Sequence, residues 1–212
     1  FMVLFISCGD KGTDPKPASN AMVNVVHASP DAPGVDLLVD DVVAGTNLTF
    51  PNHTGYLSVA AGMRNIKVNV TGTDQTAIEA NLDLMKDVSY SVYATGKVAN
   101  IAPLVLEDNL ATPADGKAHV RFIHLSPDAP AVDIMLTDGT IVFGDVEFLE
   151  VVDFTPLDAA TYDLQVRLQG TDTVVLDLPG INLVNQTIYT VFAKGLVLSL
   201  IHISEPTRPT LI

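Results

Sequence analysis

The chain has 212 residues, of which 48% are hydrophobic and 17% are charged, so it contains enough apolar material for a packed core and is not a disordered chain. Its 25 acidic and 11 basic side chains give a net charge of −14, which repels phosphate backbones and argues against nucleic-acid binding. No apolar run reaches the roughly 20 residues of a membrane-spanning helix. The length suits one large domain or two domains of about 100 residues each.

Residues 1–20 are predicted to lie outside any folded domain. Phe1 to Ser7 form an unbroken apolar stretch that stops at Cys8, and a polar segment rich in Pro, Gly, Asp and Lys follows. This arrangement is typical of the end of an export signal. The segment resembles a bacterial lipobox, which implies that Cys8, the only cysteine, receives a diacylglyceryl group. We therefore expect a signal-peptide remnant, a lipid anchor on Cys8 and a flexible tether, which together place the protein in the bacterial cell envelope.

Two stretches of the chain are copies of each other. Residues 23–36 read VNVVHASPDAPGVD and residues 120–133 read VRFIHLSPDAPAVD, at an offset of 97. Further blocks match at offsets of 98 and 99. A repeat of this length is a whole domain, because each copy can bury its own core. We predict copy 1 over 21–107 and copy 2 over 118–197, joined by the polar linker 108–117.

Each copy is predicted to consist of strands. Short segments rich in Val, Ile, Thr and Tyr are separated by Gly, Pro, Asn or Asp, and in 65–70 and 163–168 apolar residues alternate with polar ones. No stretch shows a helical pattern. Seven or eight short strands in about 90 residues favour an all-β fold of two tandem antiparallel β-sandwiches, immunoglobulin-like or transthyretin-like. In copy 1 the expected strands are 23–27, 35–39, 65–70, 77–84, 89–95 and 101–106.

The end of the chain is predicted to be foreign to the domain. Residues 198–208 read LSLIHISEPTR, which resembles the translation of a sequencing-library adaptor. The alternative is a genuine final strand, because the stretch starts with apolar residues. On the adaptor interpretation 198–212 is a non-native tail and copy 2 lacks its closing strand. The apolar start of the tail is then expected to take the place of that strand.

The repeated stretches carry a family resemblance. VHASPDAPGVD at 26–36 and IHLSPDAPAVD at 123–133 resemble the bacterial family known as domain of unknown function 4397. The resemblance implies an exported or surface-attached β-rich protein whose domains often occur in tandem. It implies no activity and no catalytic residue, since none is established for the family.

The shared SPDAP motif is predicted to form a turn. Ser29 precedes Pro30, whose fixed φ suits a type I turn, and Pro33 keeps the residue before it extended. On this structural interpretation, His27 hydrogen-bonds the loop and Asp36 accepts backbone N–H groups from it. The motif-loop residues, structural or binding, are His27, Ser29, Pro30, Asp31, Pro33, Asp36, His124, Ser126, Pro127, Asp128, Pro130 and Asp133.

A metal site is the second interpretation of the motif. His27, Asp31 and Asp36, with Asp74, could bind a hard cation, although calcium takes about six to eight oxygen ligands. A zinc site fails on the number of ligands. We therefore expect neither a metal nor another cofactor. The histidines that could serve as zinc ligands are His27 and His53 in copy 1 and His119 and His124 in copy 2.

The sequence predicts a non-enzymatic cell-surface lipoprotein module for binding, adhesion or spacing, with specificity in the loops at one end of each sandwich. Its expected partners are the membrane, through the lipid, and a surface glycan or an envelope protein. The alternative is an envelope hydrolase or metal-dependent enzyme that uses the SPDAP loops, with Ser29 and His27 as a nucleophilic pair. An enzyme should contain a concave pocket with convergent polar groups, and a spacer should not.

Overall fold

The computed structural model describes residues 19–196 and 202–203, almost all of them in strands or in the turns between strands. Cys8 and most of the predicted foreign tail lie outside the described residues, so lipidation and the adaptor origin stay predictions. No helix within the described part of the chain is long and apolar enough to cross a membrane. The prediction of an all-β sandwich fold is confirmed.

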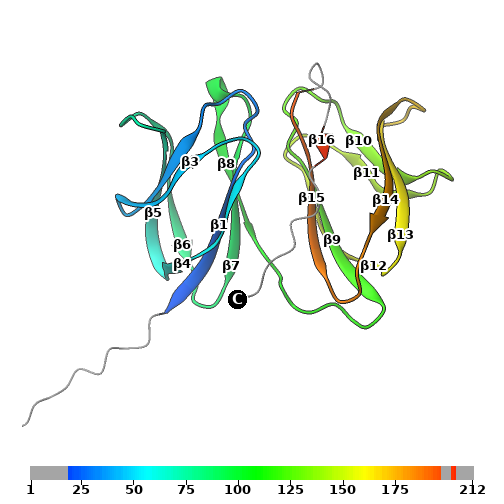
Figure 1. The fold of residues 1–212 in the computed structure, drawn as a ribbon, viewed down its shortest axis with the longest axis horizontal. Coiled ribbons are helices and arrows are strands. Elements are labelled where there is room, and N and C mark those ends of the chain that lie inside the picture. Colours follow the sequence, from blue (N-terminus) through cyan, green and yellow to red (C-terminus); the bar gives the residue numbers. More distant parts are fainter. Residues whose placement is uncertain (1–18, 197–201, 204–212) are drawn as a thin grey trace, which may run out of the picture.

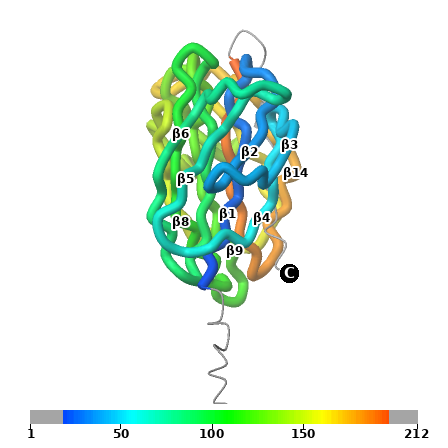
Figure 2. The backbone as a smooth tube through the Cα atoms, turned by 90° about the vertical axis from the view of Figure 1, so that its left-hand side faces the viewer, coloured from blue at the N-terminus to red at the C-terminus, as the bar shows by residue number. Residues whose placement is uncertain are grey.

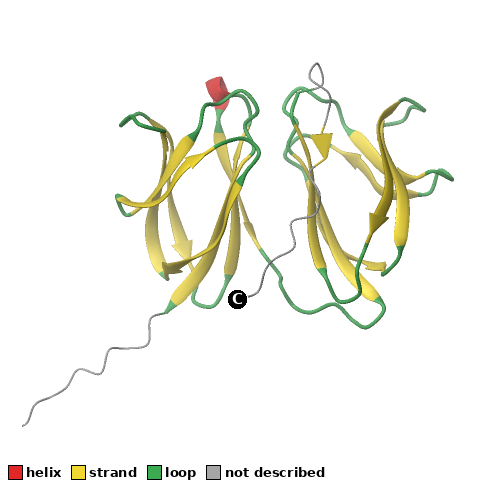
Figure 3. Ribbon diagram, viewed as in Figure 1, coloured by secondary structure: helices red, strands yellow, loops and turns green. Residues whose placement is uncertain are grey.

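Copy 1 is a sandwich of two four-stranded sheets, with the strand orders β4-β1-β7-β8 and β3-β2-β5-β6. A short 3-10 helix, η1 (Val98–Asn100), interrupts the connection from β7 to β8 and is drawn red in Figure 3. The strands are β1 (Asn20–His27), β2 (Val35–Val39), β3 (Val42–Leu48), β4 (His53–Ala60), β5 (Gly62–Val70), β6 (Thr76–Leu84), β7 (Ser89–Thr95) and β8 (Ala102–Glu107).

Copy 2 repeats this arrangement strand for strand. Its sheets have the orders β12-β9-β15-β16 and β11-β10-β13-β14, so each strand takes the place of its counterpart in copy 1. The two sandwiches stand side by side in Figure 1. The strands are β9 (Lys117–His124), β10 (Val132–Leu136), β11 (Ile141–Val146), β12 (Val151–Asp158), β13 (Thr161–Leu168), β14 (Val174–Asn182), β15 (Ile188–Lys194) and β16 (His202–Ile203).

The antiparallel pattern has one exception in each copy. β1 pairs with β7 in parallel, with Val23 opposite Tyr90, and β9 pairs with β15 in parallel, with Val120 opposite Tyr189. Alternation of apolar and polar residues reports which face a strand buries and not which way its neighbour runs. The sequence therefore predicts the strands but not the parallel direction of these two pairs.

The strand β3, at one edge of its sheet, was absent from the strands expected in copy 1, and so was its neighbour along the chain, β4. Most residues of β3 are exposed, and Gly45, Thr46 and Asn47 interrupt its apolar residues. An edge strand with so few buried side chains shows no period-2 pattern. It pairs with β2 through an irregular register, with bulges on either side of Leu37.

Each copy buries its own core, and the two cores are filled differently. In copy 1, Val25 and Gly45 occupy the positions that Phe122 and Phe143 occupy in copy 2, where the two rings stack with their centroids 6.0 Å apart. The copy 2 core also contains an apolar cavity of about 70 Å³, whereas the cavity in the copy 1 core measures about 10 Å³. The core of copy 2 is therefore built from larger side chains and is packed less completely.

A third apolar cluster joins the copies. It is formed by the outward faces of the sheets β4-β1-β7-β8 and β12-β9-β15-β16. The ring of Tyr93 lies edge-on to that of Phe192, with centroids 6.0 Å apart. The cluster consists of Val26, Ala28 and Tyr93 from copy 1 and of their counterparts Ile123, Leu125 and Phe192 from copy 2. All six side chains are buried, so the two sandwiches pack directly against each other.

A buried ion pair lies beside this cluster. Asp108, the first residue of the predicted linker, is buried, and its Oδ1 lies 2.7 Å from Nη2 of Arg121. The hydroxyls of Tyr56 and Ser91 each donate to Asp108 Oδ2 at 2.7 Å. Burial and the neighbouring carboxylate of Asp108 raise the pKa of Tyr56 well above its usual value. The residue that follows β8 is thus part of the contact between the copies.

Two residues of the predicted tail form β16. Ile203 pairs with Ala193 and His202 pairs with Lys194. In copy 1, β8 pairs with β7 over six residue pairs, from Tyr90 to Thr95. β16 therefore lies where β8 lies in copy 1, but over only two residue pairs.

Candidate binding loops

The two SPDAP motifs lie at the same end of the molecule. β1 and β9 run in the same direction in Figure 1 and both finish at the histidine of their motif. We call this end the loop end. The opposite end, where β1 begins at Asn20, is called the tether end, and Figure 2 shows β1 rising from it.

The histidine of each motif is a buried link to its own loop. His27 and His124 are fully buried, and their Nε2 atoms donate to the carbonyl oxygens of Pro33 at 3.0 Å and of Pro130 at 3.2 Å. Burial lowers the pKa of His124, because desolvation disfavours the charged imidazolium. A second contact holds each ring in place, since an aromatic ring lies edge-on to it with centroids 6.4 Å apart: Phe50 for His27 and Phe148 for His124.

The serine of each motif is buried as well. Ser126 Oγ donates to the carbonyl oxygen of Gly195 at 2.8 Å, and Ser29 Oγ lies 3.5 Å from Asp31 Oδ1. Across the described residues, neither hydroxyl hydrogen-bonds to the neighbouring histidine ring. The nucleophilic pair of Ser29 and His27 is therefore not assembled, and both side chains lie away from solvent.

The aspartate that ends each motif connects separate loops. Asp36 Oδ1 accepts the backbone N–H of Asn47 at 2.7 Å and the hydroxyl of Thr71 at 2.9 Å, and Oδ2 accepts the N–H of Gly72 at 3.4 Å. The Asn47 N–H lowers the pKa of Asp36. The expected donors were those of the SPDAP loop itself, and this prediction is wrong. The donors come from β3 and from the turn between β5 and β6, because these segments border the start of β2.

Asp133 connects the corresponding segments of copy 2. Its Oδ1 accepts the N–H of Asp145 at 2.7 Å, and its Oδ2 accepts that of Gly170 at 3.3 Å. Asp133 is buried, whereas Asp36 is only half-buried. Both copies therefore use the last aspartate of the motif to connect these segments, and the aspartate is more deeply buried in copy 2.

The middle aspartates of the two motifs have different partners. Asp31 is exposed, and its Oδ1 accepts the N–H of Val98 in η1 at 2.8 Å. Asp128 Oδ2 lies 3.9 Å from Nζ of Lys97, an ion pair between the copies. Each SPDAP loop is therefore held against the connection between β7 and β8 of copy 1. The prolines of the motifs lie on the loop surface, half-buried at Pro30 and Pro127 and exposed at Pro33 and Pro130.

The described residues contain no cluster of three or more His, Cys, Asp or Glu side chains that could hold a metal ion. Asp74 is exposed in the turn after β5 and is not joined to the motif. The Nδ1 of His53 accepts the N–H of Gly55 at 3.1 Å. The structure thus does not bring the proposed cation ligands together.

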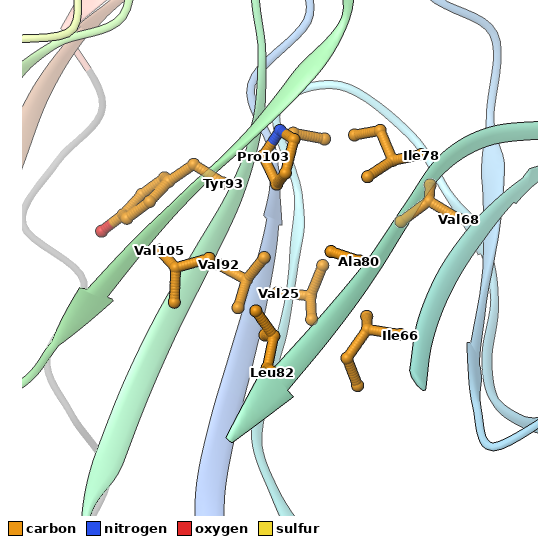
Figure 4. Close-up of a pocket in the computed structure, with 11 residues that line it drawn as sticks. Val25, Ile66, Val68, Ile78, Ala80, Leu82, Val92, Tyr93, Pro103 and Val105 are labelled. Atoms are coloured by element: carbon orange, nitrogen blue, oxygen red, sulfur yellow. The ribbon is translucent and has the colours of Figure 1, made fainter. Parts of the chain in front are cut away.

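No residue of the motif loops lines either of the two core cavities. Figure 4 shows the copy 1 cavity, lined by Val25, Ile66, Val92 and other apolar side chains. The copy 2 cavity is also lined by apolar residues and by Tyr162. Neither contains the convergent polar groups of a catalytic pocket.

Sequence reasoning missed the aromatic residue beside each histidine. Phe50 and Phe148 stand at an offset of 98, which is one of the repeat offsets, so their recurrence was a usable signal. The next residue in copy 2, Leu149, is exposed and has a φ of 69°, and its N–H donates to the carbonyl oxygen of His124 at 2.8 Å. A left-handed apolar residue at a loop tip is uncommon and marks a constrained segment.

Comparisons with known proteins give a family and a distant structural likeness. A family model described as a domain of unknown function (DUF4397) matches residues 21–135. A carbohydrate-binding module of family CBM26 from Eubacterium rectale Amy13K, crystallised with maltoheptaose, has a TM-score of 0.28 and 10% sequence identity, covering 88% of this chain and 96% of that chain. No curated protein matches the chain in sequence.

Proposed function

We propose that this chain, which belongs to the family described as a domain of unknown function (DUF4397), is a non-enzymatic binding or adhesion module of the bacterial cell surface. Its loop end contacts a surface glycan or an envelope protein, and a lipid on Cys8 anchors it to the membrane. The two sandwiches hold their loops in one fixed surface.

The observation that carries this proposal is the set of side-chain hydrogen bonds that fix the loops of both copies at the loop end. In copy 1, His27 holds the SPDAP loop, Asp31 holds η1, and Asp36 holds β3 and the turn after β5. The histidine and the last aspartate make matching bonds in copy 2. Loops fixed before binding lose less conformational entropy when a ligand is bound. This arrangement supports recognition by pre-ordered loops.

The loop end also presents apolar side chains to solvent. Val98 in η1, Leu149 beside Phe148, and Val174 at the start of β14 are each 39–46% exposed. Side chains of this kind, on loops held by a rigid scaffold, are typical contact residues. Because the chain enters β1 at the opposite end, a lipid on Cys8 would leave the loop end pointing away from the membrane.

Binding is tested with the full chain carrying Cys8→Ser, on arrays of bacterial surface glycans and on isolated envelope proteins. We expect binding that weakens by tenfold or more in a Val98→Ser and Leu149→Ser double variant, about 1.4 kcal/mol or more. The matched control is Met63→Ser with Met85→Ser, which removes two exposed apolar side chains at the tether end. Equal loss in both variants, or no binding at all, would contradict the proposal.

The anchor is tested separately in the natural host. Cys8→Ser in the full-length protein should move it from the detergent-soluble membrane fraction to the soluble fraction. Acyl chains supply most of the membrane affinity of a lipoprotein, so their loss should be visible by simple fractionation. Unchanged membrane association would rule out the lipid anchor and leave the binding proposal untouched.

A further inference from the structure

The copy 1 side of the interface carries a row of polar side chains. Tyr56 on β4, Asn24 on β1 and Ser91 on β7 are neighbours across the sheet, since Asn24 pairs with both of the others. Tyr56 and Ser91 donate to the carboxylate of Asp108 at 2.7 Å. The row, together with Asp108, therefore forms a negatively charged site with its hydrogen-bond donors already in place.

Copy 2 faces this row with the counterparts of the same positions. Phe154, Arg121 and Thr190 stand where copy 1 has Tyr56, Asn24 and Ser91, at the repeat offsets. The guanidinium of Arg121 lies 4.6 Å from the centroid of the Phe154 ring, and its Nη2 donates to Thr190 Oγ1 at 3.1 Å. Arg121 is thus held in place from its own side, and its Nη2 lies 2.7 Å from the carboxylate of Asp108, the residue that follows β8 of copy 1.

The apolar part of the interface is alike on both sides, while the polar row is not. Val26, Ala28 and Tyr93 share one cluster with their own counterparts, as in an isologous interface, and Tyr93 contacts its counterpart Phe192 directly. The charges differ, because Asn24 stands where copy 2 has Arg121. Asn24 is uncharged, and its Oδ1 is buried without a hydrogen-bond partner among the described residues, so copy 1 has no cation at the position where copy 2 has Arg121.

The difference has an energetic consequence. Two copy 1 faces brought together would bury two carboxylates without a cation, and two copy 2 faces would bury two guanidinium groups without an anion. An unpaired buried charge strongly opposes association, and removing one partner of a buried pair is far more costly than replacing both.

We propose that the outer face of the sheet β4-β1-β7-β8 is a docking surface selective for the copy 2 face, and that Arg121 and Asp108 are the selecting pair. Within one chain the pair closes copy 2 onto copy 1. Between chains, copy 1 of one molecule accepts only copy 2 of another. This inference concerns a face other than the loop end and does not depend on the proposed binding function.

The experiment exchanges the charges in full chains carrying Cys8→Ser. Variant P has Asp108→Arg, variant Q has Arg121→Asp, and variant PQ has both in one chain. Arg121→Asn, which installs the residue of copy 1, is a milder form of Q. The control is the exposed pair of Arg64 and Asp40, 3.1 Å apart, reversed in the same way. Small-angle X-ray scattering gives the maximum dimension, light scattering gives the mass, and hydrogen exchange of β5 and β13 shows whether each copy stays folded.

We expect P, Q and Arg121→Asn to be longer than the wild type, while the amides of β5 and β13 stay protected because each copy buries its own core. PQ should return to the compact monomer. P mixed with Q should form a one-to-one dimer, in which each copy 1 meets a copy 2 of opposite charge.

Several results would overturn the proposal. P and Q could stay as compact as the wild type, or PQ could be as extended as the single variants, in which case the pair does not select. A homodimer of P or of Q would show that the face does not discriminate between copies. A mixture of P and Q that stays monomeric would refute docking between chains. The control should behave as the wild type, because an exposed pair contributes little.

Discussion

Copy 1 and copy 2 share their loop-end links but not their cores. Both motifs tie a buried histidine to a proline carbonyl and a final aspartate to two neighbouring segments. The cores behind them differ, with Val25 and Gly45 in one and stacked Phe122 and Phe143 in the other. Apolar packing tolerates many combinations of similar total volume, whereas a buried hydrogen bond requires a particular donor and acceptor. The comparison teaches that the SPDAP motif specifies the loops and leaves the core free to vary.

The largest expected effect comes from removing one ring of the copy 2 stack. Phe122→Ala should destabilise copy 2 by about 3–5 kcal/mol, because it enlarges a cavity that is already present. Val25→Ala at the same position of copy 1 removes fewer atoms and should cost less. Chemical denaturation followed by hydrogen exchange of β5 and β13 assigns each loss to its copy. Equal losses in both copies would show that the two cores are not packed differently.

The next effect tests the links shared by the copies. Asp133→Ala leaves buried N–H groups without an acceptor and should cost copy 2 about 1–3 kcal/mol. Asp36→Ala should cost copy 1 less, because Asp36 is more exposed. Both losses should be the same with calcium and with a chelator. A calcium-dependent rise in Tm that disappears in both variants would instead indicate a cation site at the motif.

Two matched substitutions are expected to change the stability of the two copies by smaller amounts and in opposite directions. Val191 lines the cavity of copy 2 and its counterpart Val92 lines that of copy 1. Val191→Ile should stabilise copy 2 by up to about 1 kcal/mol by filling space. Val92→Ile should destabilise copy 1 by about 1 kcal/mol or more, since its core has little room for another methylene. Thermal melting of the two variants measures the difference, and the same sign in both would contradict it.

The smallest effect concerns pH. Burial lowers the pKa of His124 in the folded state, so the unfolded chain binds a proton at a higher pH than the folded chain does. The stability of copy 2 should therefore be complete above the unfolded value of about 6.5 and should fall as pH drops below it. Denaturation between pH 7.5 and 5 measures the slope, with His124→Gln as the comparison. A slope that is unchanged in His124→Gln would assign the pH dependence to other groups.

The hydrogen-bond partners within the motif show how far local reasoning extends. His27 and Pro33 are six residues apart, and the short loop between them brings the ring to the carbonyl. Asp36 was expected to act on the same loop, but its partners are 11 and 36 residues away. A turn can be derived from Ser, Pro and Asp in sequence. The neighbours of Asp36 depend on which strands lie beside β2.

The sequence alone determined that the chain is a pair of β-sandwiches, because the repeat and the period-2 pattern are properties of the residues themselves. Only the tertiary structure decided that β1 and β7 run in parallel, that the copies pack face to face, and that Asp108 meets Arg121. A pattern along one strand reports the burial of its two faces. It contains no information on which strand, which copy or which charge lies opposite, since those are set by the register and docking of whole sheets.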